Sequence, residues 1–239
     1  MGLNRQWNEQ DYPDNFVSKF YRFSNLKLSI SLSNQPPQEV ITHLSRDRVM
    51  AELIDTLTLD PIPTQPNLLL SLSRSVIYQQ LATSAAKAIF SRFQLILDAD
   101  PSAERILSLP PQQLHDIGVS RSKTQYLYNI AEFLNQHRDL PWVSLPDDEI
   151  EKSLTTIKGI GRWSVQICLM NYFRRPDIFP ELDLGLQKAM ISLYQLDLQG
   201  KQLKEKMLLL SKQWIPYRST ASLYLWQWKR NEKISRSSP

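Results

Sequence analysis

The sequence contains a single cysteine, Cys168, among its 239 residues. One thiol excludes a disulfide framework and an iron–sulfur cluster held by four cysteines. Cys168 lies in the apolar helical stretch 165–170, which predicts a small core residue. Runs of 18 apolar residues and a charged-then-apolar leader are also missing. We therefore expect neither a membrane span nor a secretory signal, and an intracellular protein whose compartment the sequence leaves open.

Strand patterns are absent after residue 40, where apolar side chains recur with helical periodicity. The expected helices are 38–57, 67–81, 83–96, 102–108, 111–117, 120–137, 147–156, 162–173, 184–196, 200–213 and 217–229. With 42% hydrophobic residues, these helices can bury a sizeable core, as one domain or as two small ones that share a cleft. The sequence predicts an all-α fold.

Outside these helices the chain is polar. Residues 1–36 form an N-terminal arm of uncertain structure, in which apolar residues alternate as in a strand only over 26–32. Residues 37–230 are the predicted helical domain, and residues 231–239 are a short polar tail that we expect to fray. We assign no function to the arm.

Positive charge gathers in the last fifth of the chain, although the net charge is only +4 and the sequence pI is about 9.1. Only Glu205 is acidic between residues 201 and 230. The basic residues of this stretch are Lys201, Lys204, Lys206, Lys212, Arg218, Lys229 and Arg230. A basic face suits a polyanion such as DNA and predicts salt-sensitive binding, whereas the simpler alternative is an ordinary solvated helix surface.

Two of the six glycines stand close together in Leu154-Thr-Thr-Ile-Lys-Gly-Ile-Gly-Arg-Trp163. Gly159 and Gly161 allow a sharp turn between two helices and leave backbone N–H groups exposed at its tip. A helix that starts near Arg162 adds the positive end of its dipole, so a phosphate can bind there. The alternative is a tight connection between packed helices.

Asp183 follows Gly161 by 22 residues and directly precedes the expected helix 184–196. A carboxylate at this place can cap the helix, and it can also stabilise positive charge that develops on a substrate. The two roles are compatible.

These residues resemble the helix-hairpin-helix DNA glycosylase superfamily, and within it the 3-methyladenine DNA glycosylase II, or alkylpurine glycosylase, family. The segments Ser73–Ala82, Ile117–Tyr126 and Trp214–Trp226 support the narrower likeness, which covers roughly residues 40–229. The resemblance implies two helical subdomains flanking a cleft for DNA and a base, with the helix-hairpin-helix at 154–173. It also implies a monomer that flips alkylated purines out of double-stranded DNA and excises them in base excision repair.

The resemblance also implies roles for individual residues. Asp183 is the expected catalytic residue, and Gly159 and Gly161 bind a phosphate. Leu81, with Gln80 beside it, matches the wedge that fills the gap in the duplex, unless Leu81 is a core residue at a helix end. The base pocket is expected to include Trp163, Ile167 and Trp226. Relatives have an aromatic residue at the position of Ile167, which leaves the lesion preference open.

Other residues of the matched segments keep two interpretations. Trp214, Tyr217 and Trp228 fit either the core or the pocket. In segment 117–123, Gly118 and Ser120 can cap two helices or contact DNA.

The expected reaction is hydrolysis that leaves an abasic site. Superfamily members that cleave the strand carry a lysine where this chain has Trp163, and Lys158 lies on the wrong side of the hairpin. The resemblance implies no organic cofactor and no catalytic metal, but a monovalent cation, Na⁺ or K⁺, between hairpin carbonyls and a phosphate. The alternatives are a bifunctional glycosylase/lyase and a non-catalytic DNA-binding hairpin protein.

Overall fold

The computed structural model describes residues 35–61, 65–98 and 100–237, with side chains as far as Glu232. Every element in these ranges is helical, which confirms the all-α prediction. The possible strand at 26–32 lies outside the described residues. No helix in the described ranges is both long and apolar enough to cross a membrane.

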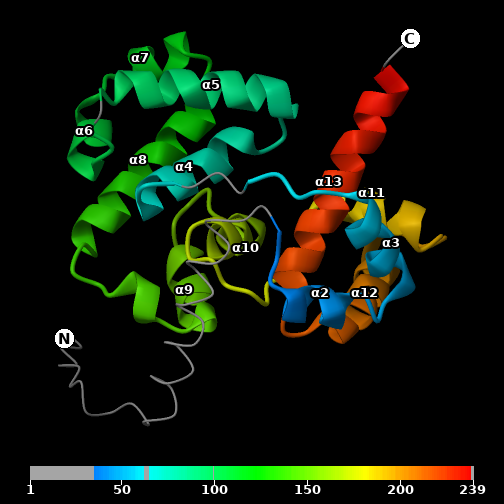
Figure 1. Cartoon of the computed structure of the whole chain (residues 1–239). Helices are drawn as coiled ribbons and strands as arrows, with labels where there is room; N and C mark the ends of the chain where they lie inside the picture. Colours follow the sequence, from blue (N-terminus) through cyan, green and yellow to red (C-terminus); the bar gives the residue numbers. More distant parts are fainter. Residues whose placement is uncertain (1–34, 62–64, 99, 238–239) are drawn as a thin grey trace, which may run out of the picture.

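The helices gather around two separate hydrophobic clusters, which we call the central and the terminal lobe (Figure 1). The central lobe comprises α4 (Leu68–Tyr78), α5 (Thr83–Ile96), α6 (Ala103–Ser108), α7 (Pro111–Asp116), α8 (Arg121–Gln136), η2 (Trp142–Ser144), α9 (Asp147–Leu154) and α10 (Arg162–Asn171). Helix α4 is buried along most of its length, because its leucines and small serines face neighbours on all sides. It packs against α5, α8 and α10.

The terminal lobe is formed by helices from the beginning and from the end of the described chain. It comprises α2 (Gln38–Leu44), α3 (Arg48–Thr56), α11 (Leu184–Leu193), α12 (Gly200–Ser211), η3 (Lys212–Trp214) and α13 (Arg218–Ser237). Trp214 is fully buried at its centre and packs edge-on against Phe179. Trp214 is therefore a core residue, while Tyr217 and Trp228 pack at the edge of the same cluster.

Cys168 is buried in the central lobe, as expected of a small core residue. Its surroundings exclude water, which raises the pKa of the thiol to about 12.

The expected single helix over 38–57 is wrong, because the chain turns at residues 45–47 and forms α2 and α3. Asp47 caps α3 by accepting the backbone N–H groups of Val49 and Met50. The same carboxylate accepts hydrogen bonds from Tyr194 Oη at 2.7 Å and from Trp214 Nε1 at 3.0 Å. These distant partners outweigh the helical periodicity of the local sequence, because a buried carboxylate must find donors.

Helix α13 also differs from the expectation, since it continues to Ser237 rather than ending near residue 229. Lys229 pairs with Glu232 one turn further along, and Arg230 donates to Gln227 one turn earlier. Pairs at this spacing stabilise a helix, so the first part of the polar tail is helical.

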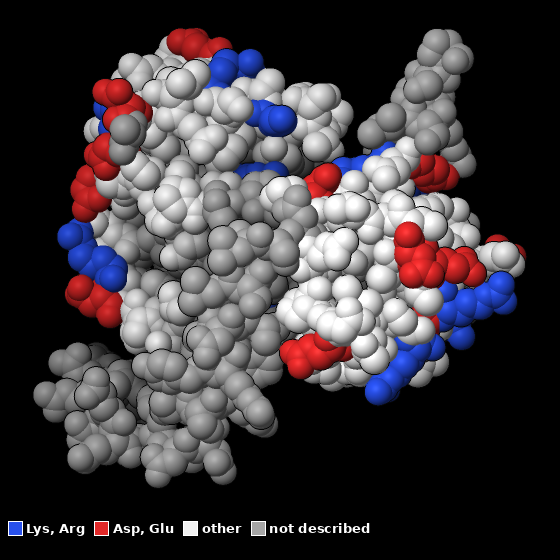
Figure 2. Space-filling model, in the orientation of Figure 1, with Lys and Arg blue, Asp and Glu red and all other residues white. Residues whose placement is uncertain are grey.

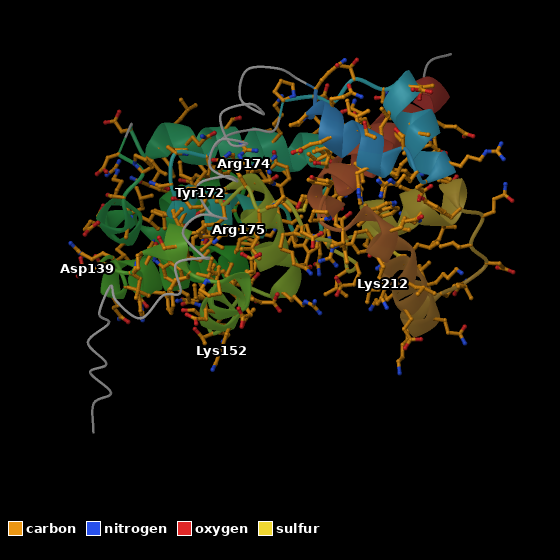
Figure 3. All side chains as sticks on the ribbon, turned by 60° about the horizontal axis from the view of Figure 1, so that its bottom comes forward. Asp139, Lys152, Tyr172, Arg174, Arg175 and Lys212 are labelled. Atoms are coloured by element: carbon orange, nitrogen blue, oxygen red, sulfur yellow. The ribbon has the colours of Figure 1, made fainter. Side chains whose placement is uncertain are left out.

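The connection between α10 and α11 crosses from one lobe to the other and is held at both ends. On the central lobe, Arg175 pairs with Asp147 at 2.7 Å, and it lies near Tyr172 and Arg174 at the end of α10 (Figure 3). On the terminal lobe, the carboxylate of Asp177 accepts hydrogen bonds from the Nε and an Nη of Arg218, at 2.6 and 2.9 Å. The connection thereby sets the position of the residues just before α11.

Candidate active site

Asp183 stands directly before α11, at the end of this connection. Its backbone is extended, with φ −71° and ψ 120°, and its Oδ1 accepts a 2.7 Å hydrogen bond from the N–H of Leu186. The predicted N-cap is therefore confirmed. The side chain is half-buried, while Leu182 and Leu184 on either side are exposed.

Two tryptophans bind the same carboxylate. Trp163 Nε1 donates to Asp183 Oδ2 at 3.0 Å, and Trp226 Nε1 donates to Oδ1 at 2.8 Å. Trp163 comes from α10 of the central lobe and Trp226 from α13 of the terminal lobe, so the carboxylate lies where the lobes meet. Ile167 is one helical turn beyond Trp163 and is also half-buried. The structure thus brings together the predicted acid and the predicted pocket tryptophans.

The absence of a side chain at Gly185 leaves space for the contact between Trp226 and Asp183. A β-carbon added to Gly185 would lie 3.0 Å from Asp183 Oδ1 and 3.7 Å from Trp226 Cδ1. Atoms at the first distance must shift apart, and the oxygen concerned is the one that Trp226 binds. A residue without a side chain is therefore part of the site, and the sequence pattern alone did not single it out.

A buried acid, Glu181, links the loop that carries Asp183 to the start of α10. Glu181 is only 4% exposed, and its carboxylate pairs with Arg162 at 3.1 Å and accepts Gln166 Nε2 at 3.2 Å. Arg162 is the first residue of α10 and also pairs with Glu151 of α9 at 3.3 Å. The ion pair joins the hairpin to the loop that carries Asp183. The only sequence signal for this role is an acid inside an apolar run, Ile178-Phe-Pro-Glu-Leu182.

The two hairpin glycines differ in their surroundings. Gly159 has φ +104°, and a β-carbon there would lie 2.2 Å from the ring of Tyr126. Gly161 has an extended backbone at the N-cap of α10, and a β-carbon there would meet nothing within 4 Å. Gly159 is thus required by the fold of the hairpin, whereas Gly161 keeps an exposed tip free of side chain.

The predicted wedge lies in the turn after α4. Leu81 is 40% exposed, so the alternative of a core leucine is wrong. Gln80 beside it is exposed and has φ +56°, in the left-handed region that favours glycine. The turn presents both side chains to solvent.

In segment 117–123, the structural interpretation is confirmed. Gly118 has φ +98° where α7 ends, and the Ser120 hydroxyl accepts the N–H of Lys123 at the start of α8. These are ordinary helix caps. The side chain of Lys123 makes two hydrogen bonds that the sequence does not indicate. Its Nζ donates to the carbonyls of Ile77 and Gln79 at 2.9 and 2.8 Å.

The expected basic face over residues 201–230 is partly paired with acids, most of which lie outside that stretch. Arg218 pairs with Asp177, Arg230 with Asp60 and Lys229 with Glu232, while Lys201 pairs with Glu205 inside the stretch. Figure 2 shows a row of basic side chains along the lower right of the terminal lobe, with acidic side chains beside it. The salt-sensitive binding expected of this stretch stays a prediction.

Residues 73–216 match the family described as HhH-GPD superfamily base excision DNA repair protein. The chain belongs to this superfamily. YfjP of Bacillus subtilis, provisionally named a DNA-3-methyladenine glycosylase, is 35% identical over 80% of this chain and 68% of its own length. DNA-3-methyladenine glycosylase 1 of Schizosaccharomyces pombe is 33% identical over 65% of this chain and 70% of its own.

The fold of this HhH-GPD protein also matches a solved structure. The Schizosaccharomyces pombe 3-methyladenine DNA glycosylase Mag1, in complex with abasic DNA, superposes with a TM-score of 0.72. The match is 27% identical and covers 84% of this chain and all of the other. The likeness to 3-methyladenine DNA glycosylases read from the motifs is confirmed.

Proposed function

We propose that this HhH-GPD protein is a DNA glycosylase that excises alkylated purines, of the 3-methyladenine type, from double-stranded DNA and leaves an abasic site. The observation that carries the proposal is the Asp183 carboxylate held by the indoles of Trp163 and Trp226 where the two lobes meet. The named relatives support the substrate class, and the complex of Mag1 with abasic DNA supports the partner. One chain supplies all of these residues, which favours action as a monomer.

The hairpin binds the DNA backbone in this proposal. The tip at Gly161 is open, and the first N–H groups of α10 point out of the helix start beside it. These donors and the positive end of the helix dipole stabilise a phosphate without reading the base sequence. The hairpin thereby places the protein on any stretch of DNA.

Leu81 and Gln80 occupy the gap that a flipped nucleotide leaves. Flipping costs a few kcal/mol, and damaged or weakly stacked bases cost least. An exposed leucine regains part of that free energy, because its side chain leaves water when it enters the base stack. The exposed wedge turn is the feature of the structure that supports this step.

The flipped base is recognised by the faces of Trp163 and Trp226. Their N–H edges are engaged by Asp183, and because both side chains are only half-buried, the exposed part of each electron-rich ring can contact a ligand. A cationic alkylpurine gains about 1–2 kcal/mol from such a face when both are desolvated. Because that gain is small, most of the selectivity comes from the weak glycosidic bond of a purine that already carries positive charge.

Asp183 stabilises the transition state. As the bond from C1′ to the purine nitrogen breaks, both bonding electrons leave with the base and the sugar becomes positively charged. Water then adds to C1′ and loses a proton, which gives the abasic sugar. The three hydrogen bonds that Asp183 accepts fix the carboxylate before the reaction begins, and such preorganised charge is usually the largest catalytic effect. Trp163 stands where a lyase has its lysine, so the strand stays intact.

We extend the proposal to a monovalent cation, Na⁺ or K⁺, that links hairpin carbonyls to a phosphate. The carbonyls of Lys158 and Gly159 accept amide donors from Asn129 and Gln79, and each oxygen keeps a second lone pair for the ion. Exchange of Na⁺ and K⁺ for Li⁺ at constant ionic strength is expected to weaken DNA binding. An unchanged Kd for DNA in Li⁺ would show that neither Na⁺ nor K⁺ takes part in DNA binding.

The test of the activity is release of free purines from DNA treated with dimethyl sulfate, followed by chromatography of the released bases. The DNA is also run on a denaturing gel before and after alkali. We expect alkylpurines in solution and strand breaks only after alkali. Breaks without alkali would show a lyase, and absence of released purine would leave a protein that binds DNA without this chemistry.

A further inference from the structure

One face of α8 contacts both loops that meet DNA in the proposed function. Lys123, Tyr126 and Asn129 follow one another at intervals of three residues on this helix. Lys123 binds the end of α4 just before the wedge turn, whereas Asn129 Nδ2 donates to the hairpin carbonyl of Lys158 at 3.0 Å. Between them, the ring of Tyr126 packs against Gly159. The wedge turn and the hairpin therefore share one rigid support.

The wedge turn needs such support, because its backbone is unfavourable. Gln80 adopts φ +56°, which residues with a β-carbon avoid unless the surrounding structure holds them there. The backbone hydrogen bond across the turn, from the N–H of Leu81 to the carbonyl of Tyr78, is long at 3.5 Å. Contacts from outside the turn must keep Leu81 in its exposed position.

Lys123 supplies one of these contacts. Its Nζ donates to the carbonyl of Ile77 in the last turn of α4, where the helix dipole is negative, and to the carbonyl of Gln79, the residue after the helix. An ammonium group so placed restrains the end of the helix and the first residue of the turn. Lys123 is partly buried, and this burial lowers the pKa of its ammonium group.

Gln79 supplies the second contact and reaches the hairpin directly. Its Nε2 donates to the carbonyl of Gly159 at 3.1 Å and to Ser164 Oγ at 3.3 Å. Gln79 precedes Gln80 in the chain, and Ser164 lies in the first turn of α10 beside the hairpin. One amide side chain thus spans the wedge turn and the hairpin.

We infer that Lys123 and Gln79 are positioning residues that hold Leu81 at a fixed place relative to the hairpin, so that a phosphate bound at the hairpin sets the depth and register at which the wedge enters the duplex. The inference rests on the proposed function. Neither side chain has to touch the lesion or the reacting sugar, because both act through Leu81.

The test compares two substrates under single-turnover conditions. One is a duplex with a paired methylated purine, and the other carries the same lesion unpaired in a one-nucleotide bulge, where less unstacking is needed. Leu81→Ala is expected to slow excision from the paired site by about tenfold and from the bulge by much less. Lys123→Met, which keeps the aliphatic stem, and Gln79→Met are expected to show the same selective loss.

The decisive variant is the double substitution Lys123→Met with Leu81→Ala. If Lys123 acts through the wedge, the double variant is no slower than Leu81→Ala alone, within about twofold. Losses that multiply, or equal losses on paired and bulged lesions, would show that Lys123 only stabilises the fold. Gln79→Met provides the same comparison if Lys123→Met does not fold, and Lys152→Met, exposed on α9 (Figure 3), is the control for loss of a lysine.

The two levels of failure are distinguishable. Wild-type protein that releases no purine from either substrate overturns the proposed function and this inference with it. Wild-type activity that Leu81→Ala leaves unchanged overturns the wedge, and with it any positioning role that acts through the wedge. A selective effect of Leu81→Ala without one in Lys123→Met and Gln79→Met overturns the inference alone.

Discussion

A β-carbon on Gly185 would lie 3.0 Å from Asp183 Oδ1, which makes Gly185 the residue that lets the carboxylate and Trp226 meet. Gly185→Ala is therefore expected to displace the carboxylate while it leaves the fold intact. The contact requires a shift of a few tenths of an ångström, and misplacement of a reacting group by about 1 Å costs about 100-fold in rate. We therefore expect excision to slow by up to about tenfold in single-turnover assays.

The free energy of unfolding of this variant should change little. Alanine is favoured over glycine inside a helix by about 0.5–1 kcal/mol, but Asp183 Oδ1 also caps α11 by accepting the N–H of Leu186, and a weakened cap costs up to about 1 kcal/mol. Thermal unfolding measures this effect. A Gly185→Ala protein with wild-type excision would show that the contact between the new methyl group and Asp183 relaxes harmlessly.

The indole N–H of Trp226 is expected to contribute to the rate separately from its ring. Trp226→Phe keeps an aromatic side chain but removes the 2.8 Å bond to Asp183. A hydrogen bond to a charged group contributes about 1.5–3 kcal/mol, so we expect a fall in kcat of about tenfold or more.

Trp214→Phe is the matched control, because it also removes an indole N–H that binds a carboxylate, here Asp47 at 3.0 Å. That indole lies in the core of the terminal lobe, so its loss should lower the melting temperature without slowing excision by folded protein. Equal losses of activity in the two variants would mean that Trp226 serves only the fold.

The two hairpin glycines should respond differently to alanine. Gly159→Ala combines a left-handed backbone with a clash against Tyr126. We expect destabilisation of about 2 kcal/mol or more, since the strained backbone alone costs about 1–2 kcal/mol. Thermal unfolding should show a melting temperature lower by at least about 4 °C.

Gly161→Ala meets open space and is expected to cost no more than about 1 kcal/mol as a poorer N-cap. Its methyl group lies at the tip where a phosphate would approach, so the Kd for DNA should rise. Titration of fluorescent duplex DNA measures this. Unchanged affinity in a folded Gly161→Ala protein would move the phosphate site away from the hairpin tip.

The sequence predicted most helices and the order of the site motifs because the relevant signals are local. Ser120 and Asp183, for example, cap the helices that directly follow them. The break at Asp47 was missed because the partners of its carboxylate, Tyr194 and Trp214, lie 147 and 167 residues further along.

The same reason explains what could not be read at the site. The tryptophans were expected near a base, but their bonds to Asp183 span 20 and 43 residues and follow only from the meeting of the two lobes. The link from Gln79 to the hairpin spans 80 residues. Motifs identify which residues take part, whereas hydrogen bonds between distant segments appear only once the chain has folded.

The central claim is that the charge of Asp183 drives base excision, and Asp183→Asn tests it most directly. Asparagine is also a good N-cap, so α11 should keep its start, but the side chain loses its negative charge and one of the two indoles loses an acceptor. The measurement is single-turnover release of purine from methylated duplex DNA, with the Kd for the same DNA determined in parallel. The account predicts excision slower by about 100-fold or more at a Kd within about threefold of wild type. Excision at the wild-type rate by a folded Asp183→Asn protein would contradict it.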